Sequence, residues 1–172
     1  DSGRDFDLLR ERVIFPIRDA KGRVVGFGGR ALNDEIKPKY INSPDSEVFH
    51  KNQLLYGLYE GRKQKAQDWL MVEGYMDVIS QHQAGFDNAI ASLGTALTEN
   101  QAALIKRYTS EVYLAYDSDG AGINAAKRAI GILRNVGLSQ RIIDLKPYKD
   151  PDEFLKNLGA EAYEERIKNA IT

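Results

Sequence analysis

The chain contains no cysteine and only two histidines, His50 and His82. Without cysteine it can have no disulfide framework, no thiol nucleophile and no zinc ribbon. Two histidines are also too few for a histidine-rich metal site. No stretch approaches the roughly 18 apolar residues of a membrane span, and no signal peptide opens the chain. We therefore expect a cytoplasmic protein with no membrane association.

What is present is typical of an ordinary folded protein. The 172 residues are 42% hydrophobic and 28% charged, which argues against disorder, collagen and a coiled-coil rod. This length favours one or two domains and allows burial of about 70% of the unfolded surface. A sizeable hydrophobic core is therefore expected.

The charges are distributed unevenly. Residues 1–66 hold 13 Lys and Arg against 10 Asp and Glu, whereas residues 67–172 hold 11 against 15. A basic front half beside an acidic back half suggests a polyanionic partner and a site that concentrates carboxylates. Random scatter of charge is the alternative.

The first part of the chain is expected to form a hairpin followed by a loop and a helix. Apolar runs flank a turn, and the glycines at 26, 28 and 29 indicate a bend or a close backbone approach. The predicted elements are strands at 13–17 and 23–27 around a turn at 19–22, a loop over 33–47 and a helix over 52–65.

From residue 69 onward, short apolar runs alternate with helical patterns. This alternation predicts βαβ units, a parallel sheet covered on both faces and hence an α/β fold. Thr98 and Gln101 form a capping box, and Gly137 is placed to end a helix. The predicted strands are 69–72, 89–91, 112–116 and 141–145. Helices are predicted to end at Gly85, to begin at Thr98 and to span 121–136, and one or two closing helices to span 150–172.

Carboxylates follow the predicted strands. Glu73 comes just after the first, and Asp117 and Asp119 just after the third. The carboxyl ends of parallel strands gather at one sheet edge, so these acids should share a cleft with the loop at 92–95. Their mutual repulsion calls for a cation, and oxygen ligands favour Mg²⁺ or Mn²⁺. The alternative is that the aspartates form a turn and cap a helix.

Asp150 allows two interpretations of its own. With Pro151 after it and Glu153 three residues on, it makes a good helix start. It also follows the fourth strand, where it could add to the acidic cluster.

The front half offers complementary groups. Cations for phosphates and aromatic rings for stacked bases are the composition of a single-strand nucleic-acid groove. A solvated charged surface over a small core is the alternative. The cations are Arg12, Arg30, Lys37, Lys39 and Lys51, and the aromatic residues are Phe27, Tyr40, Phe49 and Tyr56.

Two motifs resemble the Toprim domain that bacterial primases, type IA and type II topoisomerases and some nucleases share. They are Glu-Gly-Tyr-Met-Asp at 73–77 and Asp-Ser-Asp-Gly-Ala-Gly at 117–122. Further segments, which cover nearly the whole chain in order, resemble the bacterial replicative primases. These are RVIFPI at 12–17, GFGGR at 26–30, KYINSP at 39–44, FHK at 49–51, LYGL at 55–58, SLGT at 92–95 and DPDE at 150–153.

The resemblance implies a Toprim-type, Rossmann-like parallel sheet flanked by helices, with a small basic N-terminal α+β element. The expected division is a basic element at 1–66, a Toprim domain at 67–149 and a C-terminal helical segment at 150–172. The implied activity is primer synthesis by a DNA-directed RNA polymerase, with a single-stranded DNA template, ribonucleoside triphosphates and an RNA primer as partners.

The resemblance also implies roles for individual residues. Glu73, Asp117 and Asp119 would bind Mg²⁺ or Mn²⁺ and act in catalysis, with Glu73 as the candidate for acid/base help. Asp150, with Asp152 as a further candidate, would complete the acidic patch. The positions linked to template or nucleotide phosphates are Arg12, Arg30, Lys39, Asn42 and Lys51.

Whole primases of this family also carry a zinc domain before the catalytic core and a helicase-binding domain after it. We expect zinc and the replicative helicase to bind only through such regions, which are absent here. The chain thus resembles an excised fragment, which alone would be weakly active or inactive.

Three alternatives stay open. A Toprim nuclease or topoisomerase would use the same acids to cleave a strand, although nothing marks one of the nine tyrosines as a nucleophile. A non-catalytic module would bind nucleotides or single-stranded DNA without needing the acids. A receiver domain would need an acid pair after the first strand, where only Glu73 stands.

Overall fold

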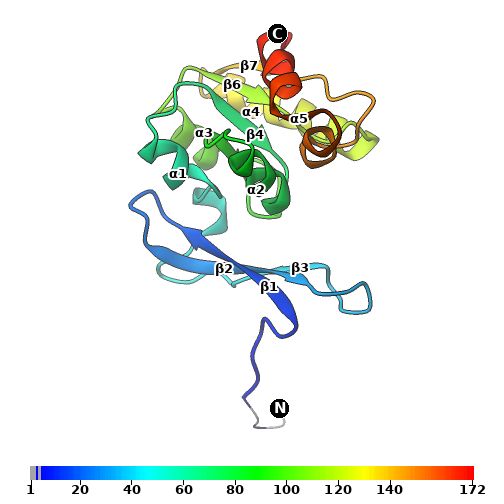
Figure 1. Ribbon diagram of the computed structural model, residues 1–172. Coiled ribbons are helices and arrows are strands. Elements are labelled where there is room, and N and C mark those ends of the chain that lie inside the picture. Colours follow the sequence, from blue (N-terminus) through cyan, green and yellow to red (C-terminus); the bar gives the residue numbers. More distant parts are fainter. Residues whose placement is uncertain (1–2, 4) are drawn as a thin grey trace.

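The computed structural model describes residue 3 and residues 5–172, and it contains two β-sheets of different kinds (Figure 1). Residues 1, 2 and 4 of the expected N-terminal element lie outside the described residues. The first sheet is antiparallel, in the order β1-β2-β3. Its strands are β1 (Arg12–Arg18), β2 (Val24–Ala31) and β3 (Tyr40–Asn42).

The predicted hairpin is confirmed, and its turn is fixed by Asp19. One carboxylate oxygen of Asp19 accepts hydrogen bonds from the backbone N–H groups of Lys21 (2.9 Å) and Arg23 (3.0 Å). Gly22 supplies the left-handed conformation of the turn, with φ of 86°. The second strand continues to Ala31 rather than ending at Phe27, because its glycines keep pairing with β1.

The expectation of an unbroken loop over 33–47 is wrong, because this segment contains β3. The strand has three residues, too few to show an alternating pattern, and lies between prolines. It forms by pairing with β2, with Asn42 opposite Gly28 and Tyr40 opposite Arg30.

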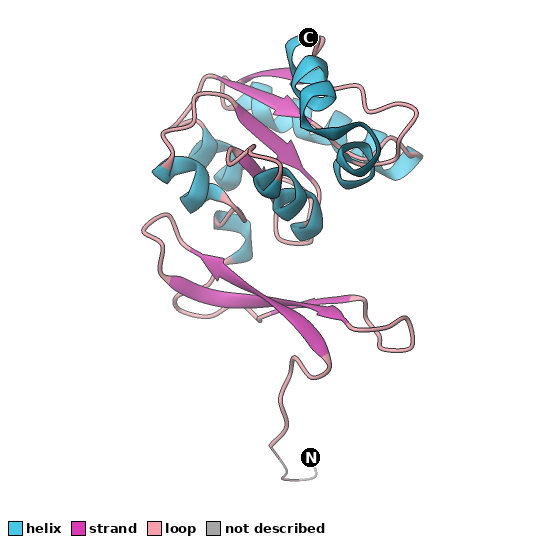
Figure 2. Ribbon diagram, viewed as in Figure 1, coloured by secondary structure: helices cyan, strands magenta, loops and turns pink. Residues whose placement is uncertain are grey.

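The second sheet is parallel, as predicted, with the strand order β5-β4-β6-β7. Figure 2 shows its helices packed around it, above the antiparallel sheet. The strands are β4 (Trp69–Val72), β5 (Ala89–Ala91), β6 (Glu111–Leu114) and β7 (Ser139–Ile142). The helices are α1 (Leu58–Lys63), α2 (Tyr75–Gln83), α3 (Glu99–Ile105), α4 (Gly120–Asn135) and α5 (Pro151–Lys168).

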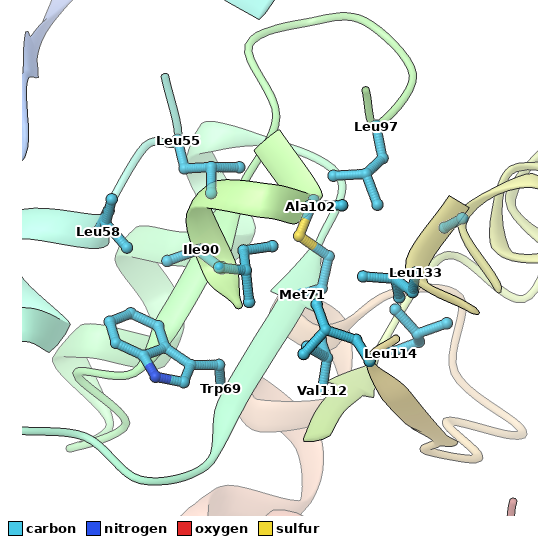
Figure 3. Packing of buried hydrophobic residues seen from close by; sticks show 13 residues of the cluster. Leu55, Leu58, Trp69, Met71, Ile90, Leu97, Ala102, Val112, Leu114 and Leu133 are labelled. Carbon is cyan, nitrogen blue, oxygen red and sulfur yellow. The ribbon is translucent and has the colours of Figure 1, made fainter. Parts of the chain in front are cut away.

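Alternate residues of β4 serve the two faces of this sheet. Trp69 and Met71 pack with residues of α1, α3 and α4, whereas Leu70 and Val72 pack with residues of α2 and α5. All four side chains are buried, which explains why β4 is a continuous apolar run. Figure 3 shows Trp69, Met71 and Ile90 within the first of these clusters.

Two further strand boundaries differ from the predictions. β6 stops at Leu114 rather than at residue 116, and β7 spans 139–142 rather than 141–145. Ile143 and Leu145 are nevertheless buried beyond the end of β7, so an apolar run there marked burial rather than strand pairing.

The predicted helix over 52–65 is broken into two parts. A 3-10 helix, η1 (Lys51–Gln53), precedes α1, and the residues between them are not helical: Leu54 is extended, and Gly57 before α1 is left-handed with φ of 87°. Tyr56 there exchanges backbone hydrogen bonds of 2.9 and 3.1 Å with Ala91 of β5. This pairing with a distant strand overrides the local helical pattern.

Each outer strand of the parallel sheet pairs with one residue from a segment outside the sheet. Tyr56 pairs with Ala91 on the outer side of β5, and Ile171 pairs with Ile142 on the outer side of β7. The Ile142–Ile171 hydrogen bonds measure 2.7 and 3.1 Å. The first piece comes from before the sheet in sequence and the second from after it.

The predicted helix start at Thr98, the helix end at Gly137 and the closing helical segment are confirmed. The Thr98–Gln101 capping box is formed, and Gly137 follows α4 in the left-handed conformation with φ of 78°. The closing segment forms α5, which is kinked at Gly159. Within the part of the chain that the structure describes, no helix is both long and apolar enough to cross a bilayer.

Tyr75 joins the two sheets. Its ring stacks on Phe15 of β1 at 5.1 Å and meets Tyr56 edge-on at 4.7 Å. A Cβ at Gly28 would lie 2.7 Å from the Tyr75 ring, so the predicted close approach at this glycine is confirmed. The Tyr75 hydroxyl donates to Asn42 Oδ1 (2.6 Å), and Asn42 Nδ2 donates to the Leu93 carbonyl (3.0 Å).

Candidate active site

A cavity of about 560 Å³ lies at the carboxyl ends of β4 and β6, where the antiparallel sheet faces the parallel one. Its wall is acidic on the parallel-sheet side and basic on the other. This is the edge at which an open α/β sheet binds ligands. The lining residues are Arg30, Lys39, Tyr40, Asn42, Glu73, Gly74, Tyr75, Met76, Asp77, Ser92, Gly94, Asp117, Asp150, Asp152 and Lys156.

Glu73 and Asp117 meet here, as their places after two neighbouring strands predict. Glu73 directly follows β4, and Asp117 comes three residues after the end of β6. The Glu73 carboxylate accepts a hydrogen bond from the Asp117 backbone N–H at 2.9 Å. The Glu73 side chain therefore fixes the position of the backbone at Asp117.

Asp119 is placed differently. Its carboxylate accepts from the Gly122 N–H at 2.8 Å and thereby caps α4, and the side chain does not line the cavity. The capping alternative thus describes its geometry, and its role as a metal ligand stays a prediction. A Cβ at Gly122 would lie 2.1 Å from the Asp117 carbonyl oxygen, so glycine is required where the chain turns into α4.

Asp150 satisfies both of its interpretations at once. Its carboxylate caps α5 by accepting from the Glu153 N–H at 2.8 Å, and it also lines the cavity. Asp152 lines the cavity too and accepts from the Lys156 ammonium at 2.6 Å.

Sequence reasoning missed Asp77 as a site residue. This acid lies in the first turn of α2, half-buried in the cavity wall. Burial, followed by the charges of Asp150 and Asp117, raises its pKa to about 7. The available signal was its place at the end of the Glu-Gly-Tyr-Met-Asp motif, in the first turn of the helix that follows β4.

The acids are incompletely neutralised. Burial and then the charges of Glu73 and Asp150 raise the pKa of Asp117 to about 6, while Lys149 opposes this shift. Clustered carboxylate oxygens with too few cations among them suit a hard divalent ion such as Mg²⁺ or Mn²⁺. Over residue 3 and residues 5–172, no three acidic or histidine side chains form a ready-made cage for an ion, so this fit rests on the donor chemistry.

Three of the five predicted basic or polar positions reach the cavity, namely Arg30, Lys39 and Asn42. The Nε of Arg30 is buried and has no hydrogen-bond partner within the described residues. Such an unpaired donor beside the cavity suits an anionic ligand, since leaving it unpaired is costly.

Arg12 and Lys51 do not line the cavity. The Arg12 guanidinium donates to the carbonyls of Gly29 (3.4 Å) and Lys39 (3.3 Å), and so supports the antiparallel sheet. The backbone of Lys51 donates to Asp45 and accepts from Gln101, which ties η1 to α3. Any contact of these two side chains with nucleic acid stays a prediction.

Comparison with known proteins gives the same picture along the chain. A family model described as Toprim-like matches residues 70–155, and one for the N-terminal domain of the DNA primase catalytic core matches residues 1–62. The DNA primase of Clostridium acetobutylicum is 51% identical over 168 residues, which are 97% of this chain. The chain spans only 28% of that relative's length.

Solved primase structures share the fold. The Aquifex aeolicus primase, with its zinc-binding and RNA polymerase domains, superposes with a TM-score of 0.94 at 44% identity over 99% of this chain and 43% of that one. A DnaG primase catalytic domain bound to single-stranded DNA gives a TM-score of 0.88 at 45% identity, over 96% of this chain and 53% of that one.

Proposed function

This chain belongs to the Toprim-like family, in the form found in the catalytic core of bacterial DNA primases, and from that premise we propose that it supplies the site at which RNA primers are made on single-stranded DNA. One observation carries the proposal: the acids of the parallel sheet and the cations of the antiparallel sheet line one cavity. Nucleotidyl transfer needs both, because it combines a metal site with a triphosphate.

The proposed reaction is attack by a ribonucleotide 3′-hydroxyl on the α-phosphate of an incoming ribonucleoside triphosphate. The new P–O bond replaces the bond to the leaving pyrophosphate. Arg30 and Lys39 would hold phosphate oxygens, because their cations line the wall opposite the acids. Glu73 is the group proposed to help remove the proton of the attacking hydroxyl.

The residues proposed to hold the divalent ion are Glu73, Asp117, Asp119 and Asp150. Mg²⁺ or Mn²⁺, when bound there, would lower the pKa of the attacking hydroxyl and neutralise charge on the phosphates. Asp119 caps α4 through one carboxylate oxygen and, unlike the other three acids, does not line the cavity. It is therefore the least prepared of the four.

The template is proposed to cross the antiparallel sheet between Arg12 and Lys51. The primase domain solved with single-stranded DNA supports this partner for the family. We propose that zinc and the replicative helicase bind through parts of the longer protein outside this chain, and that the protein works in the bacterial cytoplasm.

Replacement of Asp117 by Asn in the full-length primase tests the proposal. The variant keeps the size of the side chain and loses its charge, so we expect primer synthesis to fall by about 100-fold or more while the fold is kept. Incorporation of labelled ribonucleotides on a single-stranded template measures synthesis, and circular dichroism measures folding.

The matched control is Glu161→Gln, which removes an exposed acid of α5 outside the cavity. Its rate should equal that of the wild type. Wild-type synthesis by Asp117→Asn at ordinary Mg²⁺ would defeat the assignment. Cutting of the labelled strand in the absence of nucleotides would instead favour the nuclease alternative.

A further inference from the structure

Ser118 stands between Asp117 and Asp119 and makes two hydrogen bonds to a different part of the chain. Its backbone N–H donates to the Lys149 carbonyl at 2.8 Å. Its hydroxyl donates to the Tyr148 carbonyl at 3.0 Å. The turn after β6 is thereby bound to the segment that leads into α5.

Core packing of Ile143 and Leu145 anchors the first part of that segment, and hydrogen bonds hold the rest. Residues 143–149 connect β7 to α5 without regular structure, and Asp144, Lys146 and Lys149 are exposed. Arg166 holds its first part, donating to the carbonyls of Asp144 (3.0 Å) and Lys146 (3.1 Å). Ser118 holds its last part, immediately before Asp150.

The position of Asp150 follows from that attachment. The Lys149 N–H donates to the Glu153 carboxylate at 2.7 Å, and the Glu153 N–H donates to Asp150 at 2.8 Å. These bonds close a small ring at the start of α5, so Asp150 moves with the carbonyls that Ser118 binds. Asp150 lines the cavity together with Asp117 and Asp77, and its negative charge contributes to the raised pKa of both.

We propose that Ser118 is a positioning residue that fixes Asp150 in the cavity wall it shares with Asp117 and Glu73, so that acids from the ends of β4 and β6 and from the start of α5 are available to one divalent cation. The proposal rests on the proposed function only in taking Asp150 as a ligand. Ser118 itself touches no reacting atom. Its hydroxyl acts through the backbone that carries Asp150.

Mn²⁺ binding by the full-length primase tests this role, read from the electron paramagnetic resonance of the free ion. Ser118→Ala removes the hydroxyl, and we expect Mn²⁺ to bind about 3- to 10-fold more weakly, the effect of one hydrogen bond. Ser118→Thr keeps the hydroxyl and should restore wild-type affinity. In an Asp150→Asn background, Ser118→Ala should add no further loss.

A metal-free measurement separates positioning from general stability. Amide hydrogen exchange of Lys146 and residues 148–150 should quicken in Ser118→Ala, while the melting temperature stays at the wild-type value. Should the alanine variant fail to fold, Ser118→Cys gives the same comparison, because a thiol is nearly as small but a weaker donor.

Unchanged Mn²⁺ affinity in Ser118→Ala, or an equal loss in the Asp150→Asn background, would overturn the proposal. The proposed function fails on a different result, namely no primer synthesis by the wild-type full-length protein together with cutting of the labelled strand in the absence of nucleotides. Weakened Mn²⁺ binding in Ser118→Ala together with that result would keep the positioning role and reject the activity.

Discussion

The two sheets of this molecule are built on different principles. The parallel sheet is buried on both faces, and its strands bring Glu73 and Asp117 to one edge whatever lies between them in sequence. The antiparallel sheet has one face against the parallel domain and leaves Ile14 and Phe27 exposed on the other. It contributes the cations Arg30 and Lys39 to the cavity.

This difference teaches which parts of the site are intrinsic and which depend on docking. Glu73 and Asp117 are placed by the topology of one sheet, at the ends of two neighbouring strands. The cations reach the cavity because the antiparallel sheet docks on the parallel domain, where Tyr75 fits against Gly28 and bonds to Asn42. The parallel sheet thus positions the acids, and the antiparallel sheet adds the cations by packing against it.

The largest effects are expected from alanine substitutions in the two hydrophobic cores, which test whether the sheets unfold separately. Ile90→Ala removes a fully buried side chain of β5, and we expect a loss of about 2–5 kcal/mol with both sheets melting together. Ile17→Ala, in the cluster between the sheets, should open the antiparallel sheet first.

Trp69 is the single tryptophan and is buried in the parallel domain, so its fluorescence in urea follows that domain. Hydrogen exchange of the β2 amides follows the other sheet. If Ile17→Ala moved both transitions equally, the two sheets would form one cooperative unit and the comparison would fail.

A bulkier residue at Gly28 would disturb the contact between the antiparallel sheet and Tyr75 of the parallel domain. In Gly28→Val the new side chain would press on the Tyr75 ring, and we expect a loss of about 1–3 kcal/mol together with weaker nucleotide binding. Equilibrium unfolding and titration with a fluorescent nucleotide measure the two effects.

Gly131 provides the control, because a Cβ there meets nothing within 4 Å in α4. Gly131→Ala should stabilise the protein by about 0.5–1 kcal/mol. Undisturbed binding in Gly28→Val would show that the cations do not need the close contact.

Loss of the Tyr75 hydroxyl tests the same contact between the sheets with a smaller expected effect. Tyr75→Phe keeps the ring contacts and removes the donor to Asn42, so we expect a loss of about 0.5–1.5 kcal/mol. A double-mutant cycle with Asn42→Ala, measured by urea unfolding, should show strongly non-additive effects. Additive losses would mean that the bond does not couple the sheets.

The smallest effect is expected at the far end of the antiparallel sheet. Burial raises the pKa of Asp19, but hydrogen bonds from Arg23 and the Lys21 amide outweigh it and leave the pKa below the usual 3.8. The ionised carboxylate therefore stabilises the turn fully above pH 3.8, and this contribution is lost as the pH falls through the lowered value.

Hydrogen exchange of the Arg23 amide between pH 5 and pH 2 would detect this loosening, corrected for the intrinsic rate. Asp19→Asn keeps an acceptor and cannot titrate, so its protection should vary less with pH. Equal pH dependence in both proteins would remove Asp19 as the cause.

The sequence allowed the strand-end acids to be predicted because a parallel sheet places them by topology alone. It could not show that the carboxylate of Asp119 turns toward Gly122, since that depends on how α4 begins. Nor could it separate Arg12 and Lys51 from Arg30 and Lys39, because a hairpin's pattern does not say which cations face a second domain. Asp77 was missed because it lies in the first turn of α2, where sequence alone does not show which side chains face the sheet edge.

Long-range pairing explains the remaining errors in the fold. The helical pattern over 52–65 gave way at Tyr56, which pairs with a strand that the local sequence does not reveal. β3 likewise exists only as a partner of β2. The boundaries at 66/67 and 149/150 stay predictions.

The pairings of Tyr56 and Ile171 have a practical consequence. Unpaired outer strands expose rows of free N–H and carbonyl groups, which recruit other chains and lead to aggregation. In this protein, a flanking segment pairs with one residue of each outer strand of the parallel sheet, Tyr56 before the sheet with Ala91 and Ile171 after α5 with Ile142. A piece trimmed to residues 67–149 would lose both pairings, so soluble expression of the acidic half calls for residues from about 54 through 172.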